Sequence, residues 1–231
     1  MSGIDILSAD NGPVLVVAPH PDDEVLGVGG TIARLSDQGC EVHVAIVTLG
    51  RAPKFTQEQT NRVRAEAAAA HEHLGIAHTH WMDFPAAELA EHPHSAVNAA
   101  LGNLVHELAP GLVLAPHPGD IHMDHQLTFL STLVASRPHQ QAYPTTIAVY
   151  ETLSETNWNA PYLTPPFVPN VFIDITDTLT RKLEAFQMFA SQVKQPPHER
   201  SVTSLNALAT LRGATVHREA AEGFVLIRSV L

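Results

Sequence analysis

A group of polar side chains directly after a short apolar run could bind a metal ion and move a proton. The run is Val14–Ala18, and His20, Asp22, Asp23 and Glu24 follow it closely. An apolar run without polar alternation is typical of a strand buried on both faces of a parallel sheet. Such a strand ends at the carboxyl edge of the sheet, where open α/β folds bind ligands. The imidazole and carboxylates would supply metal ligands and leave one acid for proton transfer, although a solvated turn is an equal alternative.

A second histidine-rich segment follows another apolar run later in the chain. Leu112–Ala115 leads to a stretch that contains His122 and His125. If both runs are central parallel strands, their carboxyl ends share an edge, so one of these histidines can meet His20 and Asp23. Three protein ligands plus water are typical of catalytic zinc, whereas structural zinc sites have four ligands and are often rich in cysteine. The sequence has one cysteine, so we expect an open, hydrolytic site.

Together the two motifs resemble those of a known family of hydrolases. Pro19–Glu24, Gly27–Gly30 and His122–His125 are similar to motifs of the zinc-dependent de-N-acetylases of the LmbE/PIG-L family. The resemblance covers most of the chain. It implies a Rossmann-like α/β fold, with a mainly parallel sheet, helices on both faces and a metal site at the carboxyl edge of the strands.

The resemblance also implies roles for individual residues. The expected zinc ligands are His20, Asp23 and His125, and the expected catalytic residues are Asp22 and His122. Zinc would polarise the amide carbonyl and activate water, while Asp22 would carry a proton from that water to the leaving amine. A protonated His122 would stabilise the oxyanion.

Candidate substrate contacts come from the same resemblance. Arg64 lies on a predicted helix where the family has an arginine that contacts sugar hydroxyls, and Asp83 ends a short strand where the family has a sugar-binding acid. Trp158 follows a segment similar to one in sugar-directed members, and its ring would suit stacking on a pyranose. The alternatives are a surface charge for Arg64, a helix cap for Asp83 and a buried ring for Trp158.

Two positions depart from the family pattern. Met123 stands where the family usually has proline, which should alter loop stiffness more than chemistry. Asp120 occupies the place of a tyrosine that helps to hold the oxyanion in some members, so it is a further candidate substrate contact. As carboxylates behind a catalytic imidazole, Asp120 or Asp124 could keep His122 charged and oriented.

Strands alternate with helices along the chain, which predicts an α/β fold. The predicted strands are 14–18, 42–49, 78–83, 112–115, 146–150, 171–174 and 224–230. The predicted helices are 31–38, 62–74, 86–90, 96–108, 127–136, 178–191 and 204–212. We expect a loop at 51–60, a lid-like segment at 159–170, and glycines at 27–30 that allow close packing of a helix on the sheet.

Length and composition limit the partners. A chain of 231 residues suits one domain, which we assign to 1–231. There are 13 basic and 24 acidic residues and a net charge of -11, which disfavours nucleic acid as a partner. Residues 1–12 have no basic segment and no long apolar run follows, so we expect neither a signal peptide nor a membrane helix, and a cytoplasmic location. The sequence is compatible with a monomer or a homo-oligomer.

The functional hypothesis is a Zn²⁺-dependent hydrolase that removes the N-acetyl group from a small amino sugar, such as an N-acetylglucosamine derivative, and gives free amine and acetate. One alternative is a metal-dependent amidase that acts on a thiol conjugate. Another is an Fe(II) oxygenase with two histidines and one carboxylate, which oxygen consumption would reveal. A third is a non-catalytic carbohydrate-binding protein, which would bind sugar without releasing acetate.

Overall fold

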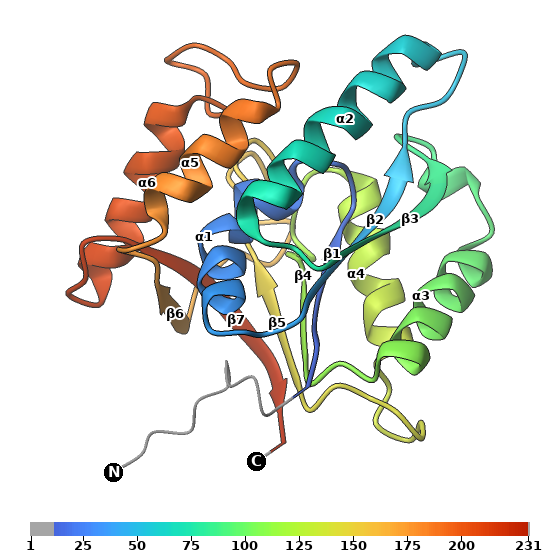
Figure 1. Cartoon of the computed structure of the whole chain (residues 1–231). Helices are drawn as coiled ribbons and strands as arrows, with labels where there is room; N and C mark the ends of the chain where they lie inside the picture. The colour runs from blue at the N-terminus through green and yellow to red at the C-terminus, as the bar shows by residue number, and fades with distance from the viewer. Residues whose placement is uncertain (1–11, 231) are drawn as a thin grey trace.

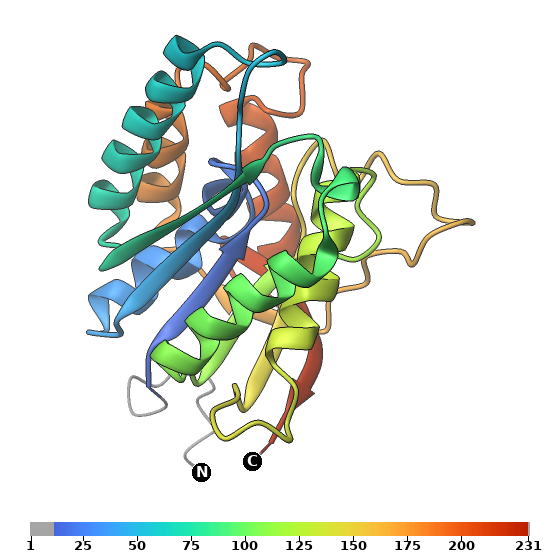
Figure 2. The same cartoon turned by 90° about the vertical axis from the view of Figure 1, so that its right-hand side faces the viewer.

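The computed structural model describes residues 12–230, which build a seven-stranded sheet between two layers of helices (Figures 1 and 2). The strands are β1 (Val14–Ala18), β2 (Val42–Leu49), β3 (His78–Pro85), β4 (Leu112–Pro116), β5 (Thr146–Tyr150), β6 (Val171–Asp174) and β7 (Ala221–Ser229). Their order in the sheet is β3-β2-β1-β4-β5-β7-β6. The first five strands of this order are parallel to one another, and β7 runs antiparallel to both of its neighbours, β5 and β6. The predicted mainly parallel sheet is therefore confirmed.

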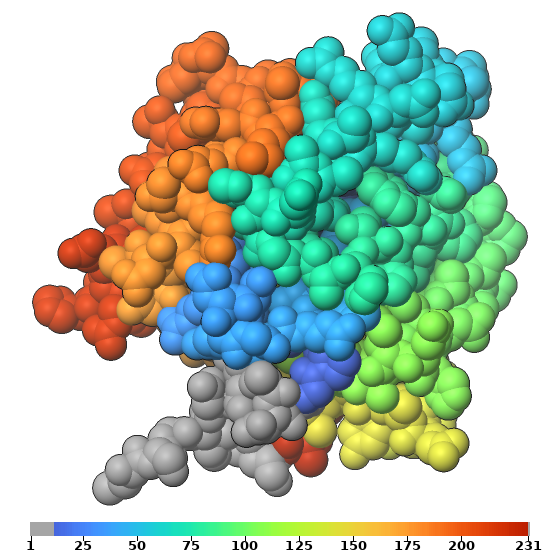
Figure 3. All heavy atoms as spheres, in the orientation of Figure 1, coloured from blue at the N-terminus to red at the C-terminus, as the bar shows by residue number. Residues whose placement is uncertain are grey.

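Helices cover both faces of the sheet, as predicted. They are α1 (Asp23–Asp37), α2 (Gln57–Leu74), α3 (His94–Leu108), α4 (Met123–Ala135), α5 (Leu179–Met188) and α6 (Val202–Thr215). One face packs against α1, α2, α5 and α6, and the other packs against α3 and α4. Figure 2 shows the two helical layers on either side of the strands. The surfaces of α2 and α5 meet on the face seen in Figure 3.

The burial of β1 explains its uninterrupted apolar sequence. Val14 and Val16 point into the core beneath α1 and α2, whereas Leu15 and Val17 point into the core beneath α3. All five residues of the strand are buried. A central parallel strand has no solvent-facing side, so no polar residue interrupts the run.

The first helix begins earlier than predicted. It starts at Asp23, inside the acidic motif, and not at Thr31. The glycines therefore lie inside the helix, where they allow close packing. A Cβ on Gly27 would lie 2.3 Å from the Tyr150 ring, and one on Gly30 would lie 2.7 Å from Ile175. The predicted packing role of these glycines is confirmed, but the predicted helix start is wrong.

Other element boundaries also differ. Helix α2 starts at Gln57 because Thr56 and Gln59 form a capping box, so the predicted 51–60 loop is shorter and the 62–74 helix is longer. The predicted 86–90 helix is only a short 3₁₀ turn, Leu89–Glu91. Helix α5 ends at Met188, before the predicted 191.

The described helices include none that is both long and apolar enough to cross a membrane. The prediction that no leader occupies residues 1–12 falls almost entirely outside the described residues. The division into a single domain stays a prediction.

Candidate metal centre and active site

The two histidine motifs meet at the carboxyl edge of the sheet because β1 and β4 are parallel neighbours. His20 follows β1, while His122 and His125 stand at the start of α4, which follows β4. The ring centroids of His20 and His122 are 4.6 Å apart, and those of His20 and His125 are 5.3 Å apart. The structure thus brings together side chains that are about a hundred positions apart in the sequence.

His20, Asp23 and His125 form a group whose donor atoms all lie within 4.8 Å of one another. Asp23 Oδ2 lies 3.2 Å from His20 Nδ1 and 3.2 Å from His125 Nε2. Two ligands at about 2.1 Å from a tetrahedral ion would be about 3.4 Å apart, close to these separations. His125 Nε2 and Asp23 Oδ1 are buried, and neither has a hydrogen-bond partner within residues 12–230. Buried polar atoms are normally paired, so these atoms and this donor set fit a divalent metal ion.

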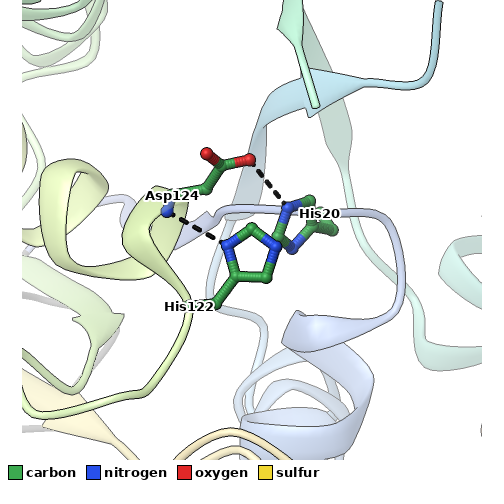
Figure 4. Close-up of side chains that lie close together, drawn as sticks. All are labelled: His20, His122 and Asp124. Atoms are coloured by element: carbon green, nitrogen blue, oxygen red, sulfur yellow. Dashed lines mark hydrogen bonds and ion pairs between the residues drawn. The ribbon is translucent and has the colours of Figure 1, made fainter. Parts of the chain in front are cut away.

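Each histidine of this group is held by a carboxylate on its other nitrogen. Asp124 Oδ2 lies 3.1 Å from His20 Nε2 (Figure 4), and Asp120 Oδ2 lies 2.8 Å from His125 Nδ1. Thr156 donates its hydroxyl hydrogen to Asp120 Oδ1 at 2.6 Å. Carboxylates placed in this way fix the tautomer and the orientation of histidines that bind metals.

The electrostatics of the group favour a cation. Burial by itself would lower the pKa of His20, but Asp124 and Asp23 raise it to about 9. Burial also opposes charge on His125, and Asp23 and Asp120 raise its pKa to about 10. Burial would raise the pKa of Asp23, yet His125 and His20 hold it well below its usual range. Carboxylates that stabilise positive charge on these imidazoles would stabilise a metal ion at the same place.

His122 lies in the same cluster but is not held as predicted. Its Nδ1 accepts the backbone N–H of Asp124 at 3.1 Å (Figure 4). Burial, followed by the nearby charge of His20, lowers the pKa of His122 to about 4. Both observations favour a neutral imidazole and not the predicted imidazolium. The carboxylates of Asp120 and Asp124, which we expected to orient His122, orient His125 and His20 instead.

Asp22 is buried beside the ligand group and is paired with an arginine that the sequence did not reveal. Arg200 Nη1 donates to Asp22 Oδ2 at 3.0 Å, and Arg200 Nε donates to Ser154 Oγ at 2.8 Å. Burial raises the pKa of Asp22 to about 7, although Arg200 opposes this shift. Arg200 lies in an irregular, proline-containing segment before α6. No local motif marks it, and only the packing of that segment over the site gives it a role.

A cavity of about 620 Å³ opens beside this cluster. His20, Asp22, His122 and Arg200 line it, together with Phe55 and Arg62 among others. A neighbouring cavity of about 310 Å³ is lined in part by Arg64 and Asp83, which form an ion pair with each other. Leu49, Gly50, Phe55 and Thr60 line both cavities. The predicted contacts Arg64 and Asp83 are therefore next to the main cavity, and Arg62, which was not predicted, lines it.

Two other predicted contacts lie elsewhere. The Trp158 side chain is exposed, faces His198 with ring centroids 6.4 Å apart, and does not line either of the two cavities. It belongs to the segment between β5 and β6, which extends away from the sheet (Figure 2). Asp120 is fully buried behind His125, so it supports a candidate ligand and does not reach the cavity.

Known proteins share both the sequence pattern and the fold. A probable N-acetyl-alpha-D-glucosaminyl L-malate deacetylase 2 from Bacillus anthracis is 30% identical over 78% of this chain and 80% of that protein. The solved N,N'-diacetylchitobiose deacetylase from Pyrococcus horikoshii is 26% identical, with a TM-score of 0.75 over 94% of this chain and 84% of that one. The 4-carboxy-2-hydroxymuconate hydratase GalB from Pseudomonas putida KT2440 has a TM-score of 0.77 over 95% of this chain and 98% of that one, at 22% identity. The last likeness concerns the fold alone.

The family model PIG-L, described as GlcNAc-PI de-N-acetylase, matches residues 15–136. This range contains both histidine motifs, the candidate ligands, all of β1 except Val14, and the strands β2 to β4. Because the match spans more than half of the sequence, the chain belongs to the PIG-L family.

Proposed function

We propose that this protein removes the acetyl group from an N-acetylated amino sugar, such as an N-acetylglucosamine derivative, with zinc as its metal. The observation that carries the proposal is that, among the described residues, the buried atoms His125 Nε2 and Asp23 Oδ1 have no hydrogen-bond partner; they lie next to His20 and the acid Asp22. The names of the related deacetylases support the substrate class.

His20, Asp23 and His125 would hold the metal. When bound, a divalent ion at this position polarises an amide carbonyl and lowers the pKa of a water molecule. Two imidazoles and one carboxylate are a donor set that zinc uses in hydrolases. The same donors can hold Fe(II), but Asp22 on the cavity wall supplies the base that hydrolysis needs.

Asp22 would take a proton from the attacking water and give it to the leaving amine. A pKa of about 7 suits both tasks, because the group can hold or release a proton near neutrality. Arg200 fixes the orientation of the carboxylate through its 3.0 Å contact.

His122 would act as a neutral hydrogen-bond donor. With Nδ1 accepting from the Asp124 backbone, the ring proton lies on Nε2, and His122 lines the cavity. From there it can donate to the oxygen that becomes negative during attack on the carbonyl.

The substrate would occupy the 620 Å³ cavity, whose wall combines charged residues with the ring of Phe55. This volume lies within the range of about 300–1,000 Å³ that is typical of small-molecule sites. Arg64 and Asp83 are proposed contacts for a more distant part of a conjugated sugar, because their cavity shares a wall with the first. The net charge of -11 argues against a polyanionic substrate.

The test is amine release from a panel of N-acetylated amino sugars by the zinc-loaded protein, with a chelated sample as the control. We expect release that chelation abolishes and that zinc restores. Absence of release from every sugar, with one equivalent of zinc bound, would overturn the proposal and turn attention to other amides. Oxygen consumption with ferrous iron would instead support an oxygenase.

A further inference from the structure

The backbone at Asp22 adopts an unusual conformation that must be held in place. Its φ is +118°, in the left-handed region that residues other than glycine rarely adopt. The carbonyl of Asp22 accepts the N–H groups of Val25 and Leu26 at the start of α1. Its own N–H donates to Glu24 Oε2 at 3.2 Å. The contact with Glu24 therefore helps to fix the turn that presents the proposed base.

Glu24 is itself tied to a distant part of the molecule. Its side chain is fully buried, and Oε1 lies 2.9 Å from Nε2 of His71 on α2. His71 is also buried, and its Nδ1 lies 2.7 Å from the Thr79 hydroxyl on β3. An imidazole with a proton on Nε2 can donate to Glu24, and its Nδ1 can accept from the Thr79 hydroxyl, so both contacts are satisfied. A continuous hydrogen-bonded chain thus links Thr79, His71, Glu24 and the N–H of Asp22.

We propose that His71 is a positioning residue that holds Asp22 in its catalytic orientation through Glu24, an inference that rests on the proposed function. His71 does not contact the candidate metal ligands His20 and His125. His71 contacts Glu24, and Glu24 accepts the backbone N–H of Asp22. Arg200 instead contacts the carboxylate of Asp22. Two separate anchors, from α2 and from the segment before α6, therefore fix one catalytic group.

The chain offers a matched control on the same helix. His73 also contacts a glutamate, since its Nε2 lies 3.0 Å from Oε2 of Glu184. This pair is at the surface, with 30% of the His73 side chain and 53% of the Glu184 side chain exposed. Replacing His73 changes the composition of the helix in the same way as replacing His71. It leaves the buried hydrogen bonds between Thr79, His71, Glu24 and Asp22 intact.

The first experiment compares the turnover of histidine variants. We expect His71→Leu to lower kcat by about 10- to 100-fold, because a small misplacement of a catalytic group has effects of this size. KM and the zinc content should stay near wild type. His71→Gln should recover most of kcat, since its amide can donate to Glu24 and accept from Thr79, and His73→Leu should match wild type. An equal loss of kcat in the leucine and glutamine variants, or no loss in either, would overturn the proposal.

A double-mutant cycle separates positioning from general damage. If His71 acts only through Asp22, adding His71→Leu to Asp22→Asn should cause no further loss of kcat. If the second change lowers the residual kcat by the same factor as in wild type, His71 acts on some other part of the site and the inference fails.

Hydrogen exchange at the Asp22 amide gives a readout that needs no substrate. We expect the wild type to protect this N–H and His71→Leu to expose it, with a smaller loss of protection in Thr79→Val. Thr79→Val removes only the hydrogen bond between Thr79 and His71, which is the one farthest from Asp22. This variant therefore provides the test if His71→Leu does not fold. Unchanged protection in the variants would contradict the proposal. A wild type that releases no amine but shows this pattern would mean that the proposed function is wrong and the structural link is right.

Discussion

Two histidine-rich clusters lie at opposite edges of the sheet, and only one of them has the geometry of a metal site. The first is the site at the carboxyl edge. The second joins the amino-terminal ends of β2 and β3, where His43, His78 and His80 lie near Glu41. His43 uses Nδ1 to contact His80 Nε2 at 3.0 Å and Nε2 to contact Glu41 at 3.1 Å. Among the described residues, the groups able to hold a metal are found only in the first cluster.

The difference between the two clusters comes from the carboxylates and not from the number of histidines. Buried Asp23 and Asp120 raise the pKa of His125 to about 10. At the other cluster, burial together with His43 and His78 lowers the pKa of His80. The acids near this cluster, Glu41 and Glu107, are exposed, so water screens their charge. A cation is therefore favoured at one edge and disfavoured at the other.

The largest expected effect separates the two clusters directly. His125→Ala removes a candidate metal ligand, the buried Nε2, and should abolish metal binding at the site. Turnover should then fall by about 1,000-fold or more, since the metal lowers the activation barrier by several kcal/mol. His43→Ala is the matched control and should keep both zinc and turnover. Both variants should be measured for zinc content by mass spectrometry and for amine release. Loss of zinc from His43→Ala would contradict the assignment of the metal site to the carboxyl-edge cluster alone.

Within the carboxyl-edge cluster, Asp22→Asn should separate chemistry from metal binding. We expect kcat to fall by about 100- to 10,000-fold because a general base is lost, while one equivalent of zinc stays bound. Turnover and zinc content should be measured on the same sample. Residual activity near the wild-type level would remove Asp22 from this role.

The carboxylates behind the ligands should have smaller effects. Asp120→Asn and Asp124→Asn keep the shape of each side chain but remove the charge that orients His125 and His20. We expect each to weaken zinc affinity by about 10- to 100-fold, which competition with a chelator would measure. If the two variants bind zinc as tightly as wild type, the carboxylates do not tune the site.

The smallest effect is expected at the amino-edge cluster. Glu41→Gln should change the free energy of unfolding by less than about 1 kcal/mol, because exposed ion pairs contribute little. Urea denaturation measures this change, and turnover should match wild type. A large loss of stability would show that the contacts of Glu41 with His43 and His78 contribute more to stability than the exposure of Glu41 indicates.

Much of the site could be predicted because its parts are local. Val14–Ala18 reads as a buried strand, and His20 and Asp23 follow it within a few residues. The parallel topology then decides which distant histidines can join them. The local sequence could not predict that Arg64 and Asp83 line a neighbouring cavity. It also could not predict that Trp158 lies away from both cavities. Arg64 lies on α2, Asp83 on β3 and Trp158 in the segment between β5 and β6, and only the packing of these elements decides which side chains lie beside a cavity.

By itself, the sequence determined the alternation of strands and helices, the two motifs and the family resemblance, because these follow from patterns along short stretches. Only the tertiary structure decided that Asp120 supports His125, that Arg200 holds the carboxylate of Asp22, and that His71 reaches Glu24. The last two contacts join residues separated by 178 and 47 positions. No local pattern encodes such pairs, since they form only when separate elements pack together and bury polar groups that must find partners.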